Sequence, residues 1–175
     1  VATDYMVDER KALEKTAKEE RRNAVVQSNI SQLESMGVQV ERQVDARDPN
    51  TYPSGNFEFI VFNHPFAVTK DEKGKTVRFG EKANILLIES FLAAAKQQIK
   101  EGGQIIIISS RARLQRWKID DIADRLNLEQ KVMRFLSSDF PGYRHEKTLG
   151  SESAESVEIT EQFAVIFTIR PTVQR

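Results

Sequence analysis

Apolar runs alternate along the chain with charged segments in which apolar residues recur every three or four positions, the pattern of alternating strands and helices. The apolar or β-branched runs predict strands at 1–6, 38–46, 57–63 and 104–110, with further strand segments around 130–137 and 161–170. The helical spacing predicts helices at 8–37, 81–103 and 118–127, and a loop with two prolines at 46–56. In the second helix, Asn84 shares the spacing of Leu87, Phe91, Ala95 and Ile99.

This order of elements predicts an α/β fold with a doubly wound, mostly parallel sheet, closed by late strands that run antiparallel. The chain has 175 residues and 39% hydrophobic content, enough for a single domain over 1–175 with a substantial core. The polar stretch at 151–156 separates the last strand from the rest.

Charge and composition exclude several classes of protein. The 26 basic and 26 acidic residues balance, so RNA binding would need a local basic patch. The absence of cysteine excludes disulfides, thiolate metal sites and a thiol nucleophile. No run approaches the roughly 18 apolar residues that span a bilayer, and no signal-peptide pattern is present. We therefore expect no membrane or metal partner, and a cytoplasmic location that would be nucleolar in a eukaryote.

Polar residues follow the predicted strands. Asp4, Asp45, Asn63 and the segment 109–111 each stand at a strand end. Ligands of open α/β sheets bind outside the carboxyl ends of the strands, so we expect these residues to line one edge. Carboxylates and an amide at that edge suit a ligand with hydroxyls and an exocyclic amine, such as a nucleoside.

Each of these residues also has a structural explanation. Asp4 is a natural helix N-cap, and Asp45 is a residue type that initiates turns. A turn also explains Asn63 and Pro65, but not the Phe66 that follows them.

The stretch "FNHPF" resembles the Asn-x-Pro-aromatic signature of amino-group methyltransferases that use S-adenosylmethionine. More broadly, residues 1–150 resemble the Rossmann-like domain of the 25S rRNA uridine-N3-methyltransferase-like family. The resembling stretches are "VATDY", "SNISQLESMGVQV", "VDA", "FEFIVFNHP", "ANILLIESFLAAA", "GGQIIII", "RWKIDDIADRLNL" and "FPGYRHEKTLG", of which the last is the most specific.

The resemblance implies a methyltransferase that uses S-adenosylmethionine to methylate a nitrogen of an RNA base. It places Asp4 at the cofactor ribose, with Asp8 as a competing position, and Asp45 with Ala46 at the adenine. Asn63, His64, Pro65 and Phe66 fall in the catalytic motif, and Asn63 also borders the cofactor. The family more often shows Asn, aromatic, Pro, His there, so the exchange of His64 and Phe66 leaves the target atom open. His64 is either the base that removes an imide proton or a surface histidine.

RNA contacts are expected from the segment "SSRARLQRWK" at 109–118, in which basic residues surround an aromatic ring. Its candidates are Arg111, Arg113, Arg116 and Lys118 around Trp117, with a packing role for Trp117 as the alternative. Tyr143, Arg144 and His145 are expected to face the same cleft. The segment 67–80 is either a lid over the acceptor or a mobile charged loop.

In class I methyltransferases the first strand and its glycine-rich turn lie under the cofactor, and neither is found in this chain. That strand would lie between the strands at 1–6 and 57–63. We expect a preceding segment or a second chain to complete the sheet, or a degenerate domain that no longer binds cofactor. Three functions follow: an RNA methyltransferase, a non-catalytic binding module, or a methyltransferase of another substrate, including a delivered effector.

Overall fold

A computed structural model describes residues 20, 23–41, 44–53, 55–70, 76–78, 80–136 and 162–171. The chain divides into two compact units, residues 1–43 and 44–175. The described part of the first unit is a helix over 23–35, which confirms this portion of the helix predicted at 8–37. The helix ends at Gly37, whose φ is 82°, and the amide of Val38 donates to the carbonyl of Leu33 at 3.0 Å. This is the Schellman arrangement, in which a left-handed glycine stops a helix.

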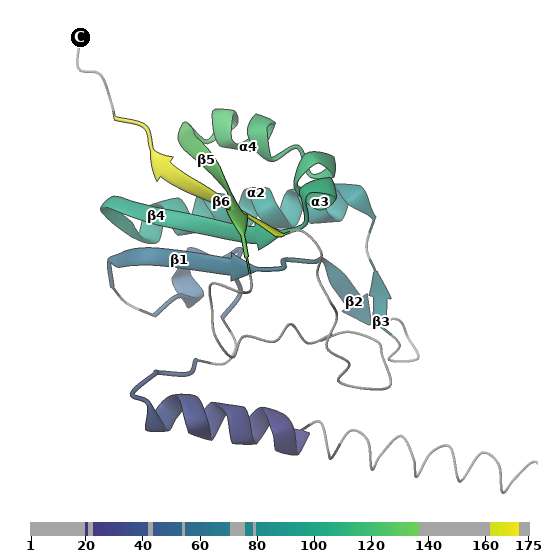
Figure 1. Ribbon diagram of the computed structural model, residues 1–175, viewed down its shortest axis with the longest axis vertical. Helices are drawn as coiled ribbons and strands as arrows, with labels where there is room; N and C mark the ends of the chain where they lie inside the picture. Colours follow the sequence, from purple (N-terminus) through teal and green to yellow (C-terminus); the bar gives the residue numbers. More distant parts are fainter. Residues whose placement is uncertain are drawn as a thin grey trace, which may run out of the picture. The chain divides into compact units, whose positions relative to one another are not determined.

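The second unit contains a four-stranded sheet in the order β1-β4-β6-β5 (Figure 1). Its strands are β1 Phe57–Asn63, β4 Ile99–Ser109, β5 Leu128–Phe135 and β6 Gln162–Ile169. β1 and β4 are parallel, whereas β6 is antiparallel to both of its neighbours. The antiparallel late strands are therefore confirmed, but the prediction of a mostly parallel sheet is wrong for the part of the chain that the structure describes.

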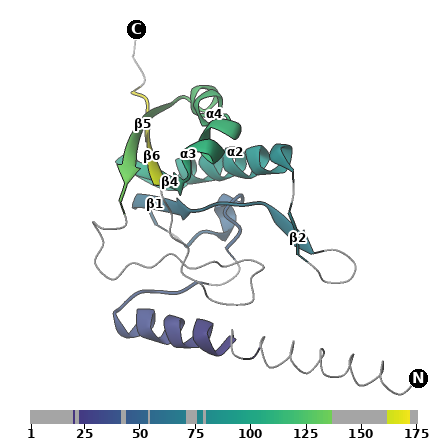
Figure 2. The same cartoon turned by 45° about the vertical axis from the view of Figure 1, so that its right-hand side comes forward.

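The helices α2 Glu81–Gln98, α3 Arg111–Arg116 and α4 Ile119–Arg125 pack on one face of this sheet (Figure 2). Alternate residues of β4 show which face it is, because Ile105 and Ile107 are buried in the core while Ile106 and Ile108 are only half-buried. Apolar residues of all three helices close the core: Ile88, Phe91 and Leu92 of α2, Leu114 of α3, and Ile119, Ile122 and Ala123 of α4. A doubly wound sheet has helices on both faces. Within the described ranges, helices cover only one face of this sheet.

Two predicted elements differ from the structure. Residues 38–41 and 44–46 form no strand, although 38–46 was predicted as one. The helix predicted at 81–103 stops at Gln98, and residues 99–103 open β4 instead. Two glycines follow this end: Gly102 has a φ of 74°, and an added Cβ at Gly103 would lie 3.0 Å from the carbonyl oxygen of Glu58 in β1. The backbones of β1 and β4 therefore approach closely at Gly103.

Short elements also occupy segments predicted as loops. The segment 67–80 contains the antiparallel hairpin β2 Val68–Lys70 and β3 Thr76–Arg78. α3 lies in the basic segment 109–118, and the 3₁₀ helix η1 Pro49–Thr51 lies in the loop 46–56. The strand predicted at 1–6 lies outside the described residues. Among the helices that the structure describes, none is long and apolar enough to cross a bilayer.

Candidate functional site

The turn after β1 is the best-defined part of the predicted site. Asn63 ends β1 in register with Ile108 of β4, as the sequence predicted for a strand-end amide. The amide of His64 donates to the carbonyl of Ile108 at 2.9 Å, which extends the ladder by one residue. His64 has a φ of 49°, in the left-handed region that residues other than glycine rarely adopt. Such a conformation persists only where the surroundings hold it, and it is concentrated at functional sites.

Phe62, Pro65 and Phe66 face the core, whereas Asn63 faces the surface. Phe62 packs against Phe91 of α2 with ring centroids 4.7 Å apart, and Pro65 is fully buried. Phe66 is half-buried and packs against the same core. Asn63 is exposed, because its side chain points away from the face that Phe62 buries. The turn thus presents an amide to solvent on a rigid support, which suits a group that must hold a ligand.

A residue that the sequence analysis did not assign to the site secures the end of this turn. Asn84 lies in α2, is 4% exposed, and accepts a hydrogen bond through Oδ1 from the amide of Ala67 at 2.8 Å. The signal in the sequence was a polar residue at a position of helical apolar spacing. A buried amide needs partners, so its presence there indicated a specific contact.

The basic segment reaches this turn through α3. The guanidinium carbon of Arg113 lies over the ring of Phe66, 5.4 Å from its centroid, and that of Arg111 lies over Phe163 at 5.7 Å. Both distances are typical of cation–π contacts. These contacts bring Arg113 to the predicted catalytic motif, and the remaining faces of both arginines are exposed.

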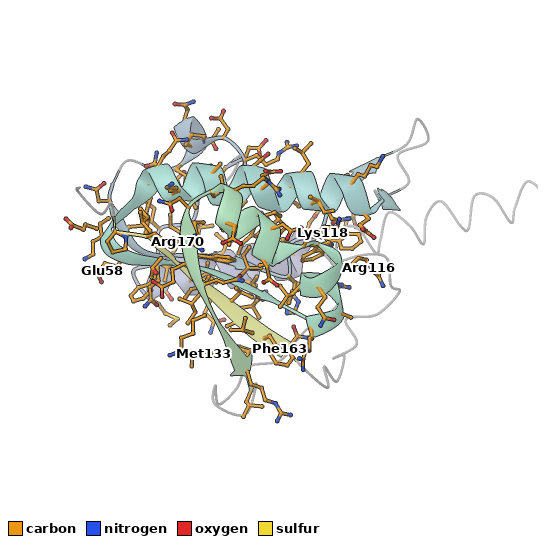
Figure 3. The ribbon with its side chains drawn as sticks, turned by 90° about the horizontal axis from the view of Figure 1, so that it is seen from above. Glu58, Arg116, Lys118, Met133, Phe163 and Arg170 are labelled. Atoms are coloured by element: carbon orange, nitrogen blue, oxygen red, sulfur yellow. The ribbon has the colours of Figure 1, made fainter. Side chains whose placement is uncertain are left out.

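Other members of the basic segment have different environments. Arg116 and Lys118 are exposed and lie at one end of the unit in Figure 3, whereas Glu58 and Arg170 lie toward the other. Trp117 is 2% exposed and lies within the core, so its ring offers no surface on which a base could stack. Its role is therefore packing, the alternative given above. Ser109, expected at the ligand edge, is fully buried.

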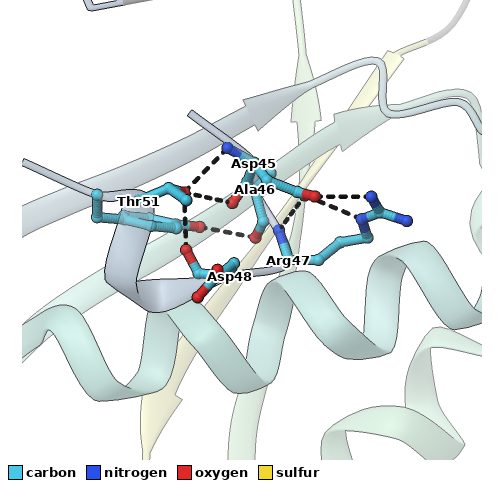
Figure 4. Close-up of polar contacts among 6 residues, drawn as sticks. Asp45, Ala46, Arg47, Asp48 and Thr51 are labelled. Carbon is cyan, nitrogen blue, oxygen red and sulfur yellow. Dashed lines mark hydrogen bonds and ion pairs between the residues drawn. The ribbon is translucent and has the colours of Figure 1, made fainter. Parts of the chain in front are cut away.

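Asp45 lies in a loop that is held together by its own side chains (Figure 4). Nε and the backbone amide of Arg47 donate to Oδ1 of Asp45, each at 2.9 Å, and Nη2 of Arg47 donates to Oδ2 at 2.6 Å. These side-chain and backbone hydrogen bonds from Arg47 lower the pKa of Asp45 to about 2. The carboxylate is therefore fully charged at neutral pH and already engaged.

Further hydrogen bonds within the loop involve Thr51 and Tyr52. The hydroxyl of Thr51 accepts from the amide of Asp45 at 2.9 Å, and the hydroxyl of Tyr52 donates to the carbonyl of Ala46 at 2.9 Å. Tyr52 is half-buried, and burial, reinforced by the charge of Asp45, raises the pKa of its hydroxyl. Ala46 therefore holds the loop together through its carbonyl, at the position predicted to border adenine.

The two predicted parts of the site attach to different ends of α2. Nε2 of Gln98, the last residue of α2, donates to the carbonyl of Pro49 in the Asp45 loop at 3.3 Å. Asn84, which holds the turn after β1, lies fourteen positions earlier (98 − 84). At a rise of 1.5 Å per residue, these anchors are about 21 Å apart. No hydrogen bond that the structure describes joins Asp45 or Ala46 to Asn63, so their predicted meeting at one edge stays a prediction.

Two of the predicted cofactor residues suit the chemistry of the cofactor that the resemblance implies. The amide of Asn63 fits, since Asn63 is exposed. The Asp45 carboxylate also fits, because it can accept hydrogen bonds from an amine of the ligand. Its side chain is 41% exposed, so such an amine can replace Arg47 as its partner. Asp4, Tyr143, Arg144 and His145 lie outside the described residues. Among the residues that the structure describes, no cluster of histidine and carboxylate side chains could hold a metal ion.

The comparisons with known proteins identify the family. The chain belongs to the BMT5-like family, whose model, described as rRNA (uridine-N3-)-methyltransferase BTM5-like, matches residues 3–147. This match confirms the resemblance drawn from the sequence, and its span includes the turn at 63–66.

Solved structures and curated proteins add less. One similar solved structure is a precorrin 8W decarboxylase from Methanobacterium thermoautotrophicum, with 13% sequence identity and a TM-score of 0.41. The match covers 78% of this chain and 59% of that protein, so the chain spans less than two thirds of its length. No curated protein matches the chain.

Proposed function

We propose that the protein is an S-adenosylmethionine-dependent methyltransferase that acts on a nitrogen of a base in RNA, with rRNA as the substrate. Membership of the BMT5-like family over residues 3–147 carries this proposal. The turn after β1 supports it, because Asn63 is exposed at a strand end while Pro65 beside it is buried.

In this proposal the cofactor would be held by Asp45 and Ala46 at its adenine, by Asp4 at its ribose and by Asn63 near its reactive end. When bound, it supplies a methyl group on a sulfonium centre. The amide of Asn63 offers both a donor and an acceptor, so it can fix the orientation of a planar base through two neighbouring polar atoms. Its support on the β1–β4 pair keeps that orientation, and accurate positioning is the main contribution a protein makes to a displacement reaction.

His64 is proposed as the group that takes a proton from the acceptor nitrogen. An imide nitrogen must lose its proton before or during methylation, and an imidazole is the side chain best matched to that task near neutral pH. The left-handed backbone at His64 fixes the direction in which its ring leaves the chain. A base in folded RNA would have to leave its stack to reach this turn.

Arg111 and Arg113 are proposed to bind the RNA backbone. Each guanidinium uses one face for an aromatic ring, of Phe163 and Phe66 respectively, and remains exposed elsewhere. A guanidinium held this way keeps its donors free for phosphate oxygens. Because Arg113 covers part of Phe66, RNA bound at Arg113 would lie next to the predicted acceptor position.

The test measures transfer of labelled methyl groups from S-adenosylmethionine to rRNA, followed by mass spectrometry of the modified nucleoside. Asn63→Ala should lower kcat by about 100-fold or more, the usual effect of removing a hydrogen-bonding group that acts in the transition state. Asn56→Ala is the matched control, since Asn56 is an exposed asparagine that directly precedes the first residue of β1. Equal kcat for Asn63→Ala and Asn56→Ala would contradict a catalytic role of Asn63.

A non-catalytic binding module is the second candidate, favoured by the engagement of Asp45 with Arg47. Calorimetric titration with S-adenosylmethionine separates the two. Micromolar binding that Asp45→Ala abolishes supports the enzyme, while absence of binding together with retained RNA affinity supports the module. If methyl groups were transferred to a small molecule or a protein instead of RNA, the protein would still be a methyltransferase, but RNA would not be its substrate.

A further inference from the structure

Asn84 is a polar residue in an otherwise apolar contact surface. The remaining buried residues of α2 are Ile88, Phe91, Leu92, Ala94 and Ala95. Burying an amide among them costs free energy unless each of its polar atoms has a partner. Asn84 meets that requirement through one contact to Ala67, seventeen positions earlier, and one to Gly80 at the start of its own helix.

The two ends of the Asn84 amide have opposite partners. Oδ1 accepts from the amide of Ala67 at 2.8 Å, and Nδ2 donates to the carbonyl of Gly80 at 3.0 Å. Because one partner can only donate and the other can only accept, these partners fix the orientation of the amide. A carboxylate or an aliphatic side chain cannot supply both bonds.

Those two partners mark the base of the hairpin that follows the turn. Ala67 directly precedes β2, and Gly80 follows β3 and is the N-cap of α2. The first pair of the hairpin joins Val68 to Arg78. A single side chain thus bridges the points where the chain leaves the β1 turn and where it returns to α2, and Figure 1 shows the hairpin projecting from that end of β1.

We propose that Asn84 is a positioning residue for the strand-end turn Asn63–Phe66, an inference that rests on the proposed methyltransferase function. The turn is held at its start by the bond from His64 to Ile108 and after its end by the bond from Ala67 to Asn84. Between them, His64 keeps its left-handed backbone. Without the bond from Ala67 to Asn84, the backbone of His64 can relax toward an ordinary conformation. The side chain of Asn63 then moves away from the position of the nitrogen to be methylated.

The effect should be on the chemical step. A displacement of about 1 Å in a positioning group can cost about 100-fold in rate. Asn84 is 4% exposed and so offers almost no surface to a cofactor, and its loss should leave KM for the cofactor within about twofold.

Two variants separate positioning from a purely structural role. Asn84→Leu removes both bonds and leaves an apolar side chain of similar size. Asn84→Asp keeps an acceptor for the amide of Ala67 but places a buried carboxylate beside the carbonyl of Gly80. A buried charge is more destabilising than a buried aliphatic group, so Asn84→Asp should be the less stable variant. Positioning predicts the reverse order for kcat, because only Asn84→Asp retains the bond to Ala67.

The measurements are urea unfolding, hydrogen exchange at the Ala67 amide, and methyl-transfer kinetics of each folded variant. We expect exchange at Ala67 to be at least 10-fold faster and kcat at least 10-fold lower in Asn84→Leu. Asn84→Asp should keep kcat within about threefold of wild type, although its lower stability also speeds exchange at Ala67. Gln97→Leu, which alters an exposed amide on the same helix, should change neither.

Unchanged exchange at Ala67 in a folded Asn84→Leu variant would overturn the proposal, as would kcat values that follow stability. If Asn84→Asp does not fold, the exchange rate at Ala67 and the kcat of Asn84→Leu alone decide whether Asn84 positions the turn. If the wild-type protein transfers no methyl group, the proposed function fails by itself, while exchange at Ala67 still decides whether Asn84 holds the turn.

Discussion

The turn Asn63–Phe66 and the loop at 45–52 each contain residues that were predicted to bind the same cofactor, yet the two segments are held in place by different means. Contacts distant in sequence hold the turn, through Ile108 of β4, Asn84 of α2 and the ring contact from Arg113 of α3. The hydrogen bonds of the loop lie mainly within it, and it is tied to the rest of the unit by one bond from Gln98 and by the packing of Ala46 and Tyr52 on the core.

This difference determines how each region responds to change. The turn can open only when parts of the core or of α2 move, so its stability follows that of the second unit. Ala46 and Tyr52 of the loop pack against the core, but the exposed pair of Asp45 and Arg47 can open without disturbing it, since local hydrogen bonds open with small free energies. Amide exchange at Ala67 reports the first case. Exchange at Arg47, whose amide donates to Asp45, reports the second.

The largest effect is expected from Phe91→Ala. Phe91 is 2% exposed and packs against Phe62, the residue before Asn63. Removing a buried phenylalanine ring costs about 3–5 kcal/mol of unfolding free energy, measured by urea denaturation. Exchange at Ala67 should accelerate with the lost stability, while exchange at Arg47 should stay nearly constant.

Leu86→Ala is the control on the same helix. Leu86 is 62% exposed, so this change should alter the free energy of unfolding by less than about 0.5 kcal/mol. Equal acceleration at Ala67 and Arg47 in Phe91→Ala would show that the loop opens only with the core, and the contrast between the two regions would be lost.

A smaller loss of stability is expected from Gly103→Ala. The added Cβ would meet Cγ1 of Ile99 at 2.8 Å and the carbonyl oxygens of Glu58 and Lys100 at 3.0 Å. Backbone atoms of a paired strand cannot easily move, so overpacking should cost about 1–3 kcal/mol in thermal or urea unfolding. The β1–β4 pair that supports the turn would be weakened directly.

Gly102 offers the comparison for that variant. Its φ is 74° and nothing lies within 4 Å of an added Cβ, so backbone conformation is the only obstacle. Gly102→Asn should cost less than Gly103→Ala, because asparagine tolerates the left-handed region. The opposite order would mean that close approach of the strands does not limit this junction.

The two arginines extend the comparison to RNA. Arg113, at the turn, is proposed to bind phosphate, whereas Arg47 is paired with Asp45 in the loop. Arg113→Gln should weaken RNA binding and reduce the slope of log affinity against log salt concentration by about 1, in filter-binding assays over a salt series. Arg47→Gln should leave that slope unchanged. Equal slopes for both variants would remove the turn from the RNA contact surface.

The sequence predicted elements that a core defines. The β-branched run of β4 and the helical spacing of apolar residues in α2 both reflect burial in the core. The apolar run of β1 likewise predicted that this strand ends at Asn63. α3 was missed because it is six residues long and buries only Leu114. The strand predicted at 38–46 was wrong because a strand needs a pairing partner, and none pairs with it among the described residues.

The candidate site was predictable in part for the same reason. Residue type and strand position located Asn63, whereas the partners Asn84 and Arg113 depend on how helices meet the turn in three dimensions. Burial of Trp117 was open in the sequence, since an aromatic ring among basic residues suits either packing or stacking. The pair of Asp45 with Arg47 was too local to alter any pattern of apolar residues.

The smallest effect is the titration of Asp45. Its pKa is lowered from 3.8 to about 2 by the hydrogen bonds from Arg47. Because the folded state holds the carboxylate more tightly than the unfolded state, the pair contributes its stabilisation above pH of about 4 and loses it as pH falls toward 2. The carboxyl-carbon shift of Asp45 in an NMR titration should therefore have its midpoint near 2.

Arg47→Gln should return this midpoint toward 3.8 and speed exchange of the amide at position 47, without changing exchange at Ala67. The pair is exposed to solvent, so the melting temperature at neutral pH should scarcely change. A midpoint near 3.8 in the wild-type protein would show that Arg47 leaves the carboxylate free in solution. The loop would then present Asp45 to a ligand as readily as the turn presents Asn63, and the proposed exchange of partners at Asp45 would not be needed.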